Sequence, residues 1–199
     1  MTPAELQEAG VTDPAVVAAS IATDPNDFPM PPGGHGQVRP NAAGAAILVQ
    51  EVVRCKPRKV LEIGTGSGYT TTLLLRAMPL VRVVSLERNS AIALNAVTNL
   101  VKADVYRGDR LETFIGDGSP CGVVNQGNIP PPYDLVLVTA AAPLDRLRRL
   151  LFTHPIAVCL IQGPDGAFIS KFMRYPDGAI RRFDVCPIAG ATPLEQGVV

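Results

Sequence analysis

The middle of the chain alternates between short β-type runs and helical patterns. Runs of apolar and β-branched residues bounded by turn residues are typical of strands, and apolar residues spaced three or four positions apart mark helices between them. Such an alternation predicts a mostly parallel sheet with helices packed on it. The predicted strands are 59–63, 81–86, 103–106, 133–139 and 156–162, and the predicted helices between them are 69–78, about 90–101 and 145–152.

The two ends of the chain have other patterns. Two β-type runs, 168–174 and 180–186, flank the turn signal Tyr175-Pro176-Asp177-Gly178, which predicts an antiparallel hairpin at the sheet edge. Upstream, 13–21 and 41–54 have the pattern of helices. We therefore expect a single domain over 1–199, with a helical cap and a proline-rich crossing in 1–56 and the sheet in 57–199.

Composition narrows the range of partners. The chain has 199 residues, with 18 Lys+Arg against 18 Asp+Glu, so its formal net charge is zero. Proteins that bind nucleic acid through its phosphates usually carry a basic excess, so we expect no nucleic-acid partner. The chain has 18 glycines and 19 prolines, and 16 of these 37 residues fall in the stretches 24–40 and 116–132, which are predicted loops.

The sequence also bears on the compartment. The first residues have neither the basic nor the apolar region of a signal peptide, and no stretch reaches the roughly 18 apolar residues of a membrane span. The four cysteines have no CxxC spacing, which favours reduced thiols and gives no zinc pattern. We therefore expect a cytoplasmic protein with no membrane contact and no metal site.

A glycine loop follows the first predicted strand. In Val60-Leu61-Glu62-Ile63-Gly64-Thr65-Gly66-Ser67-Gly68-Tyr69, glycines alternate with small polar residues before a helix begins. Bare backbone at a helix N-terminus lets a ligand approach closely and offers it free N–H groups. The dinucleotide fingerprint G-x-G-x-x-G starting at Gly64 would need glycine where Tyr69 stands, whereas acidic-x-G-x-G-x-G fits from Glu62 onward.

Acidic residues mark two further strand ends. Glu87 closes the second predicted strand, where a carboxylate can accept hydrogen bonds from the ribose hydroxyls of a bound nucleoside. Gly108-Asp109 follows the predicted strand 103–106, and there the Asp109 carboxylate would accept from an adenine amino group. Together with the glycine loop, these acids predict a nucleoside-containing ligand that lies across three strand ends.

This combination resembles the S-adenosylmethionine-dependent methyltransferases with a Rossmann-like sheet. More narrowly, VLEIGTGSGY, YDLVLVTAAAP and Gly36-Gln37-Val38-Arg39-Pro40 are similar to the protein-L-isoaspartate O-methyltransferases. The resemblance implies a doubly wound, mostly parallel seven-stranded sheet with the C-terminal antiparallel hairpin, and S-adenosyl-L-methionine as cofactor. The residues expected to bind the cofactor are Glu62, Gly64, Thr65, Gly66, Ser67, Gly68, Glu87, Gly108, Asp109 and Thr139.

The acceptor half of the site departs from the family pattern. Pro40 stands at the position of the family's active-site serine or threonine, so the catalytic residue is left open. Arg110 stands where a glycine usually follows the Gly-Asp pair, and the loop from there to Pro132 is long. Candidate substrate contacts are His35, Gln37 and Arg39.

The sequence is therefore compatible with more than one function. The first is O-methylation of a carboxylate, either isoaspartyl-like on a peptide or protein or on a small acid, by a monomer or homodimer. The alternative is a catalytically degenerate member that binds S-adenosylmethionine or S-adenosylhomocysteine as a structural or regulatory ligand. Tyr69 disfavours a nicotinamide-dependent oxidoreductase, and Thr139-Ala140-Ala141-Ala142 lacks the Asn/Asp-Pro-Pro-Tyr/Phe motif of amino-group methyltransferases and the acid of aminopropyl transferases.

Overall fold

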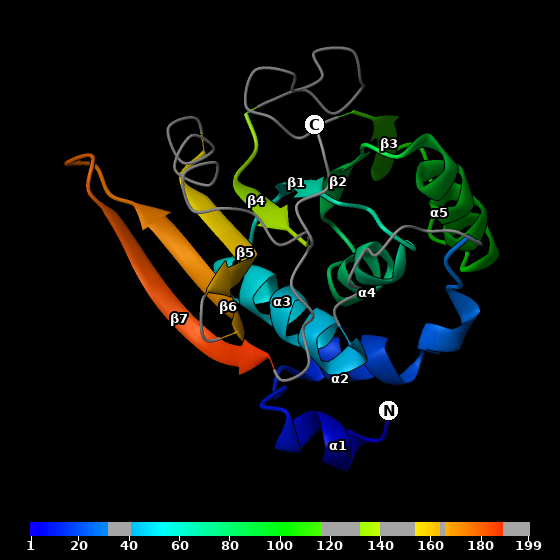
Figure 1. Cartoon of the computed structure of the whole chain (residues 1–199), viewed down its shortest axis with the longest axis horizontal. Helices are drawn as coiled ribbons and strands as arrows, with labels where there is room; N and C mark the ends of the chain where they lie inside the picture. Colours follow the sequence, from blue (N-terminus) through cyan, green and yellow to red (C-terminus); the bar gives the residue numbers. More distant parts are fainter. Residues whose placement is uncertain (32–40, 117–131, 140–153, 164–165, 189–199) are drawn as a thin grey trace.

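The computed structural model describes residues 1–31, 41–116, 132–139, 154–163 and 166–188. Its centre is a seven-stranded sheet with the order β3-β2-β1-β4-β5-β6-β7 (Figure 1). The strands are β1 Lys59–Ile63, β2 Arg82–Glu87, β3 Leu111–Ile115, β4 Leu135–Val138, β5 Ile156–Gly163, β6 Gly166–Arg174 and β7 Ile180–Ile188.

The first five strands of the sheet run parallel. β1 pairs with β2 on one side and with β4 on the other, β3 continues beyond β2, and β5 continues beyond β4. β6 and β7 then form an antiparallel hairpin on β5. The prediction of a mostly parallel sheet with a C-terminal antiparallel hairpin is confirmed. The carboxyl ends of the parallel strands therefore share one edge, which is where ligands bind in open α/β sheets.

The helices begin at residues suited to cap them. They are α1 Pro3–Glu8, α2 Pro14–Ile21, the 3-10 helix η1 Pro25–Asp27, α3 Ala42–Cys55, α4 Tyr69–Ala77 and α5 Ser90–Lys102. Asn41 accepts a hydrogen bond from the Gly44 N–H at 2.7 Å, and the Asn89 side chain caps α5. α1 and η1 were not predicted, although Thr2 and Glu5 form a capping box.

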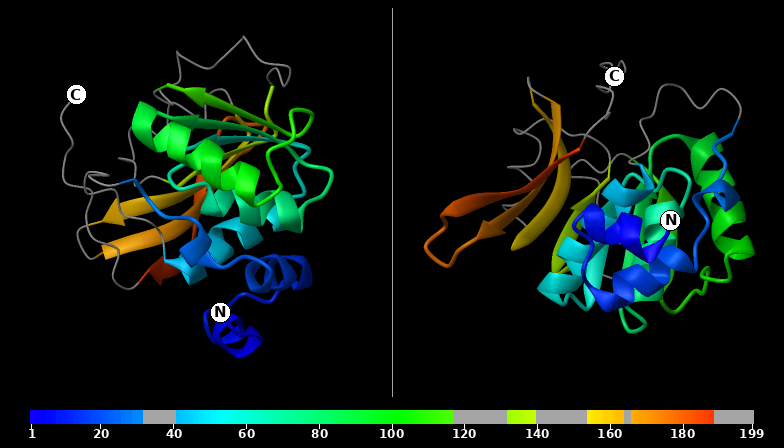
Figure 2. Two further views of the ribbon diagram at one scale, coloured as in Figure 1. Left: turned by 90° about the vertical axis from the view of Figure 1, so that its right-hand side faces the viewer. Right: turned by 90° about the horizontal axis from the view of Figure 1, so that it is seen from below.

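Two apolar clusters lie on opposite faces of the sheet. One contains Val60, Val83 and Leu135 together with residues of α3, α4 and α5, so these helices pack on one face (Figure 2). The other contains Leu61, Val84 and Val136, the neighbours of those residues along each strand. Among the described residues, no helix combines the length and apolarity needed to cross a membrane.

The predicted strand 103–106 is wrong. α5 continues to Lys102, and the Val105 N–H donates to the Leu100 carbonyl at 3.1 Å, so this backbone closes the helix. Asp104 takes a left-handed conformation, and turns carry the chain to Leu111, where β3 begins. Residues 103–106 resemble a short strand in sequence, but their backbone closes the end of α5. The predicted helix 145–152 lies outside the described residues.

Candidate cofactor site

The glycine loop bends sharply after β1. Gly64, Gly66 and Gly68 have φ values of 98°, 56° and 84°, a region that side chains with a Cβ rarely adopt. The N–H groups of Gly64 and Thr65 both donate to the Leu86 carbonyl, at 2.8 and 3.2 Å, which carries the loop across the end of β2. The loop thus lies at the carboxyl edge of the sheet.

Two of these glycines have different surroundings. A Cβ on Gly68 would meet the Leu100 side chain at 3.0 Å, so this glycine allows the loop and α4 to pack closely on α5. A Cβ on Gly66 would meet no atom of the described residues within 4 Å. Gly66 is therefore where backbone faces open space and where a ligand can press against the chain.

The helix that follows the loop begins without a side-chain cap. Gly68 is the N-cap of α4 and, having no side chain, makes no side-chain capping hydrogen bond. The first residue, Tyr69, is buried and packs edge-on against Phe28, with ring centroids 5.5 Å apart. The position at which a dinucleotide fingerprint needs glycine is thus filled by a core residue, while the helix N-terminus keeps its affinity for negative groups.

The Glu87 carboxylate is fixed against the glycine loop. It ends β2 and is 3% exposed. One oxygen accepts from the Gly66 N–H and the other from the Asn89 N–H, each at 3.1 Å. A carboxylate oxygen has two lone pairs, so both oxygens can still accept a hydroxyl hydrogen. The structure therefore brings together the glycine loop and Glu87, the predicted ribose acceptor.

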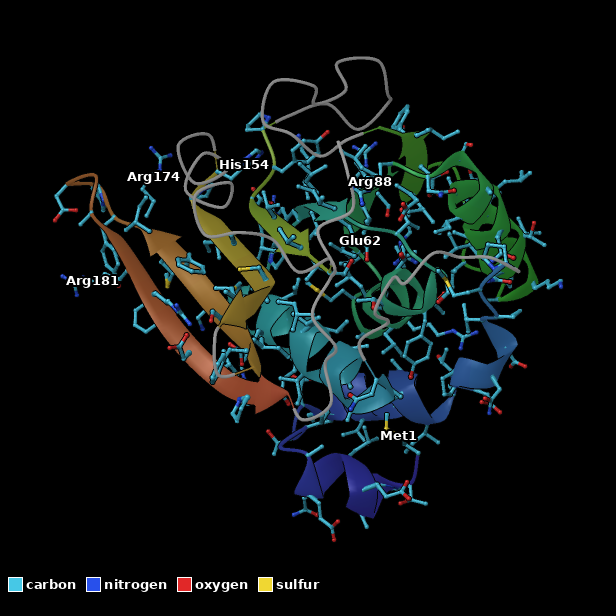
Figure 3. All side chains as sticks on the ribbon, in the orientation of Figure 1. Met1, Glu62, Arg88, His154, Arg174 and Arg181 are labelled. Carbon is cyan, nitrogen blue, oxygen red and sulfur yellow. The ribbon has the colours of Figure 1, made fainter. Side chains whose placement is uncertain are left out.

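Glu62 lies in the interior beneath the loop (Figure 3). Its side chain is fully buried, and Oε2 accepts hydrogen bonds from the hydroxyls of Thr71 and Ser85, both at 2.6 Å. Burial raises the pKa of this carboxyl to about 7, and the negative charge of Glu87 adds to the increase. Glu62 belongs to the floor of the site rather than to its open surface.

The other polar residues predicted at the site hold the loop in place. The Thr65 and Ser85 hydroxyl oxygens lie 2.7 Å apart. The Thr139 hydroxyl hydrogen-bonds the Gly64 carbonyl, and the Thr139 N–H donates to the Ile63 carbonyl at 3.1 Å. The Ser67 carbonyl accepts from the Asn99 side chain of α5. These contacts give Thr65, Ser67 and Thr139 a positioning role.

Asn99 was not singled out from the sequence, yet it connects three segments. Its side-chain amide donates to the Ser67 carbonyl at 2.9 Å and to the Pro29 carbonyl at 3.2 Å. Asn95, one turn earlier, also donates to Pro29, at 2.7 Å. Hydrogen bonds from α5 therefore hold Pro29, in the proline-rich crossing, and Ser67, in the glycine loop, against the same helix. A buried asparagine on an otherwise apolar helix face was the available signal.

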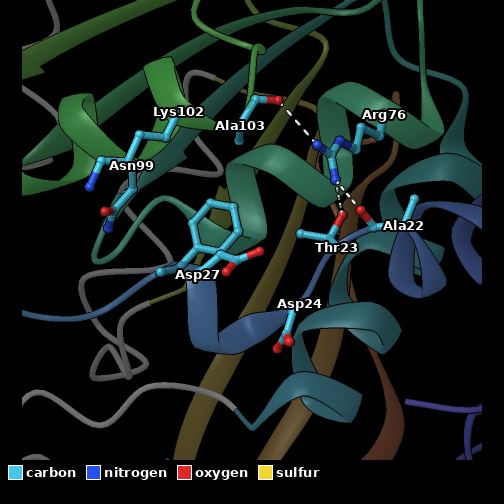
Figure 4. Close-up of a pocket in the computed structure, with 9 residues that line it drawn as sticks. Ala22, Thr23, Asp24, Asp27, Arg76, Asn99, Lys102 and Ala103 are labelled. Atoms are coloured by element: carbon cyan, nitrogen blue, oxygen red, sulfur yellow. Dashed lines mark hydrogen bonds between the residues drawn. The ribbon is translucent and has the colours of Figure 1, made fainter.

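A pocket of about 390 Å³ lies elsewhere, on the outer side of α4 and α5 (Figure 4). Arg76 forms part of its wall and donates to Thr23 and to the Ala22 carbonyl, both at 2.6 Å, and to the Ala103 carbonyl at 3.1 Å. These bonds join the C-terminal ends of two helices to the segment before η1. Asn99, which also donates to the Ser67 carbonyl of the glycine loop, lines this pocket as well.

The structure corrects the prediction for Gly108 and Asp109. Both precede β3 instead of following the third strand, and the Asp109 carbonyl accepts from Arg82, the first residue of β2, at 3.2 Å. They therefore lie at the amino edge of the sheet, away from the glycine loop. Arg110 is likewise not a substitute for a loop glycine, since it donates to the Leu75 and Met78 carbonyls at the end of α4.

A second Gly-Asp pair follows the real third strand. Gly116 comes directly after β3, and its N–H donates to the Glu87 carbonyl at 3.0 Å. The sequence continues as Asp117-Gly118, so the glycine expected after the Gly-Asp pair is present, and what looked like one long loop from Arg110 begins with β3. Asp117 itself lies outside the described residues.

The substrate candidates His35, Gln37 and Arg39, and Pro40 with them, also lie outside the described residues. The described residues hold no cluster of three or more histidine, cysteine or acidic side chains suited to a metal ion. What the structure brings together is the cofactor half of the predicted site: the glycine loop, the start of α4, Glu62, Glu87 and Thr139.

Comparison with known proteins agrees with this geometry. Residues 34–145 match the family model "Protein-L-isoaspartate(D-aspartate) O-methyltransferase (PCMT)". The chain is 28% identical to a Protein-L-isoaspartate O-methyltransferase from Stenotrophomonas maltophilia and 30% identical to one from Xanthomonas euvesicatoria, in each case over 98% of this chain and 87% of the relative. It is 40% identical to one from Methanoculleus marisnigri over 59% of this chain and 48% of the relative.

A solved structure supports the fold. A Plasmodium falciparum protein, described as a protein-L-isoaspartate O-methyltransferase in complex with S-adenosyl-L-homocysteine, superposes with a TM-score of 0.71 and 16% identity over 93% of this chain and 94% of that one. These matches confirm the resemblance that the glycine loop and the fourth-strand segment indicated, and with it S-adenosyl-L-methionine as the cofactor class.

Proposed function

Since the chain belongs to the protein-L-isoaspartate O-methyltransferase family, we propose that it transfers the methyl group of S-adenosyl-L-methionine to a carboxylate of an isoaspartyl residue in a peptide or protein. The observation that carries the proposal is the meeting of Gly66 and Glu87 at the carboxyl edge of the sheet, 3.1 Å from N–H to carboxylate. This pair offers a nucleoside a bare backbone surface and a ribose acceptor at one point.

The residues present fit the cofactor. The adenosine would lie across the loop 64–68, with its ribose hydroxyls on the free lone pairs of Glu87 and its adenine amino group on Asp117. The open space beside Gly66 and the uncapped start of α4 support this placement. When bound, the cofactor supplies an electrophilic methyl group on a sulfonium. The protein's contribution is to align the acceptor and exclude water.

The acceptor chemistry suits the described side chains. A carboxylate is already ionised and nucleophilic at neutral pH, so its methylation needs no general base. The Thr65 and Thr139 hydroxyls are engaged with Ser85 and with loop carbonyls, and neither is placed to accept a proton from a substrate. An acidic acceptor is thus consistent with the hydroxyls that the structure describes beside the loop.

The segment before α3 is proposed to hold the acceptor. Arg39 would pair with the substrate carboxylate, and His35 and Gln37 would contact the peptide. Pro40 removes the hydroxyl that the family pattern places there, so alignment would rest on the remaining groups. We expect a Pro40→Ser variant to methylate faster than the wild type.

The test is transfer of a labelled methyl group to a matched pair of peptides. The two peptides have one sequence and differ in having isoaspartate or aspartate at a single position. Label on the isoaspartyl peptide alone supports the proposal. Calorimetric binding of S-adenosylmethionine without label on either peptide or on small carboxylic acids, in the wild type and in Pro40→Ser, would instead support a degenerate, ligand-binding member.

A further inference from the structure

The two oxygens of the Glu62 carboxyl have unequal surroundings. Oε2 accepts from both Thr71 and Ser85, whereas Oε1 is fully buried and has no hydrogen-bond partner among the residues that the structure describes. A buried polar atom without a partner is costly, and the cost is greatest when the group is charged. The geometry therefore leaves Oε1 as the position for a proton.

The hydrogen bonds fix the direction of a short chain. The Ser85 hydroxyl has one hydrogen, which it donates to Glu62, so its oxygen must accept from the Thr65 hydroxyl 2.7 Å away. Thr65 is the residue between Gly64 and Gly66. The buried carboxyl is thus joined, through two hydroxyls, to the loop on which the cofactor is proposed to lie.

No positive charge among the described residues offsets the negative charge of an ionised Glu62. Thr71 faces it from α4, Ser85 from β2 and Thr65 from the loop, and all three are neutral. Among the described residues, the charge that acts on it is the negative charge of Glu87. Burial and Glu87 together favour the protonated form, and a cation placed above the loop would favour the ionised form.

The two forms of the cofactor differ in such a cation. S-adenosylmethionine carries a positive sulfonium, and S-adenosylhomocysteine has a neutral thioether at that position. Methylation of a carboxylate removes both charges at once, because the carbon–sulfur bond breaks, its electron pair stays on sulfur, and the carboxylate oxygen forms the new bond to carbon. The electrostatic surroundings of the loop therefore change at the moment of transfer.

We propose that Glu62 matches its charge to the cofactor: its carboxyl holds a proton on Oε1 in the free protein and in the product complex, and releases that proton to solvent when the sulfonium binds. This inference rests on the proposed use of S-adenosylmethionine. Glu62 is then a positioning residue that favours the charged cofactor and loosens it after transfer, when a proton returns from solvent. Product release would be coupled to proton uptake.

The test compares binding of the two cofactor forms across pH by calorimetry. Ionised Glu62 favours the sulfonium, so the ratio of the S-adenosylhomocysteine Kd to the S-adenosylmethionine Kd should rise between about pH 5.5 and 8.5. The rise should be up to about tenfold for each unit by which the pKa of Glu62 differs between the two complexes. Sinefungin, which carries an amine cation in place of the sulfonium, should follow S-adenosylmethionine. Glu62→Gln should bind both forms with a ratio independent of pH.

A control variant and an infrared measurement complete the test. Glu51→Gln, which changes a buried glutamate of α3 paired with Lys171 at 3.1 Å, should keep the wild-type pH dependence. If Glu62→Gln does not fold, infrared difference spectra of the wild type should show a protonated carboxyl band that S-adenosylmethionine removes and S-adenosylhomocysteine leaves. A pH-independent ratio in the wild type, or an unchanged slope in Glu62→Gln, overturns the inference while leaving the methyltransferase proposal standing. Absence of any cofactor binding overturns both.

Discussion

The Gly66 N–H donates to the Glu87 carboxylate at 3.1 Å, although 21 positions separate the two residues in the chain. One residue belongs to the loop after β1 and the other ends β2, and the parallel pairing of these strands brings them to the same edge. The contact gives the glycine loop a fixed position relative to the proposed ribose acceptor. It is the geometric basis of the cofactor placement.

Replacing Gly66 with valine should abolish cofactor binding. The φ of 56° is unfavourable for a side chain with a Cβ, and the new methyl groups would occupy the open space proposed for the ligand. The matched control is Gly178→Val in the β6–β7 turn, where φ is 83° and a Cβ also meets no atom within 4 Å. Calorimetry should show normal affinity in the control and none in Gly66→Val; equal affinities would refute the placement.

The corrected position of β3 predicts which aspartate contacts the cofactor. Asp117→Asn should lower affinity by about tenfold or more, because an ionised acceptor of the adenine amino group is lost. Asp109→Asn should leave affinity unchanged, since Asp109 lies at the opposite edge of the sheet, beside Arg82. Binding isotherms of the two variants decide between them. The reverse pattern would restore the original assignment of Asp109.

Glu62 should make stability fall as pH rises. Its pKa is raised by folding to about 7, so the folded state binds more protons than the unfolded state between about pH 4.3 and 7. The stabilisation is fully present below this window and is lost as pH rises through it. Relative to Glu62→Gln, the wild type should lose on the order of 3 kcal/mol of unfolding free energy across the window.

Urea unfolding of the two proteins at a series of pH values measures this difference directly. Comparing the pair removes the contributions of carboxyls such as Asp184, whose pKa is lowered by the Ser170 hydroxyl and by Arg182 and whose effect has the opposite sign. A difference that is constant with pH would mean that Glu62 is ionised throughout.

Asn99 should matter more for stability than its neighbour on α5. Asn99→Ala leaves the Ser67 carbonyl without its side-chain donor and removes one of two donors to Pro29, so we expect a loss of about 1–3 kcal/mol and weaker cofactor binding. Asn95→Ala removes a single hydrogen bond to Pro29, which is exposed to solvent, and should cost less than about 1 kcal/mol. Denaturant midpoints and calorimetry check both, and similar losses in the two variants would contradict a bracing role for Asn99.

The sequence was most informative where a pattern reflects one local cause. β1 was predicted at its observed bounds, because an apolar run ends directly at the glycine loop. Glu87 was identified because it closes the next apolar run. The third strand was predicted in the wrong place for two reasons. Val105 belongs to a helix end, and the real strand, Leu111–Ile115, has a charged residue within a mostly apolar run. That single error led to Asp109, before β3, being predicted as the adenine acid instead of Asp117, which follows β3 in the sequence.

Other features depend on tertiary packing that no local pattern records. The closeness of Leu100 to Gly68, the bonds from Asn99 to two segments and the unpartnered oxygen of Glu62 arise only when α4 and α5 pack on the sheet. The sequence placed Glu62 in a binding motif but could not show that it lies beneath the loop. Its burial changes its expected role from direct contact to charge balance.

The most direct test of the cofactor placement is a crystal structure of this protein with S-adenosylhomocysteine. The account predicts that the nucleoside lies across Gly64–Gly68 with both ribose hydroxyls on the Glu87 carboxylate and the adenine amino group on Asp117. A nucleoside bound away from Gly66, or one whose ribose makes no contact with Glu87, would contradict it.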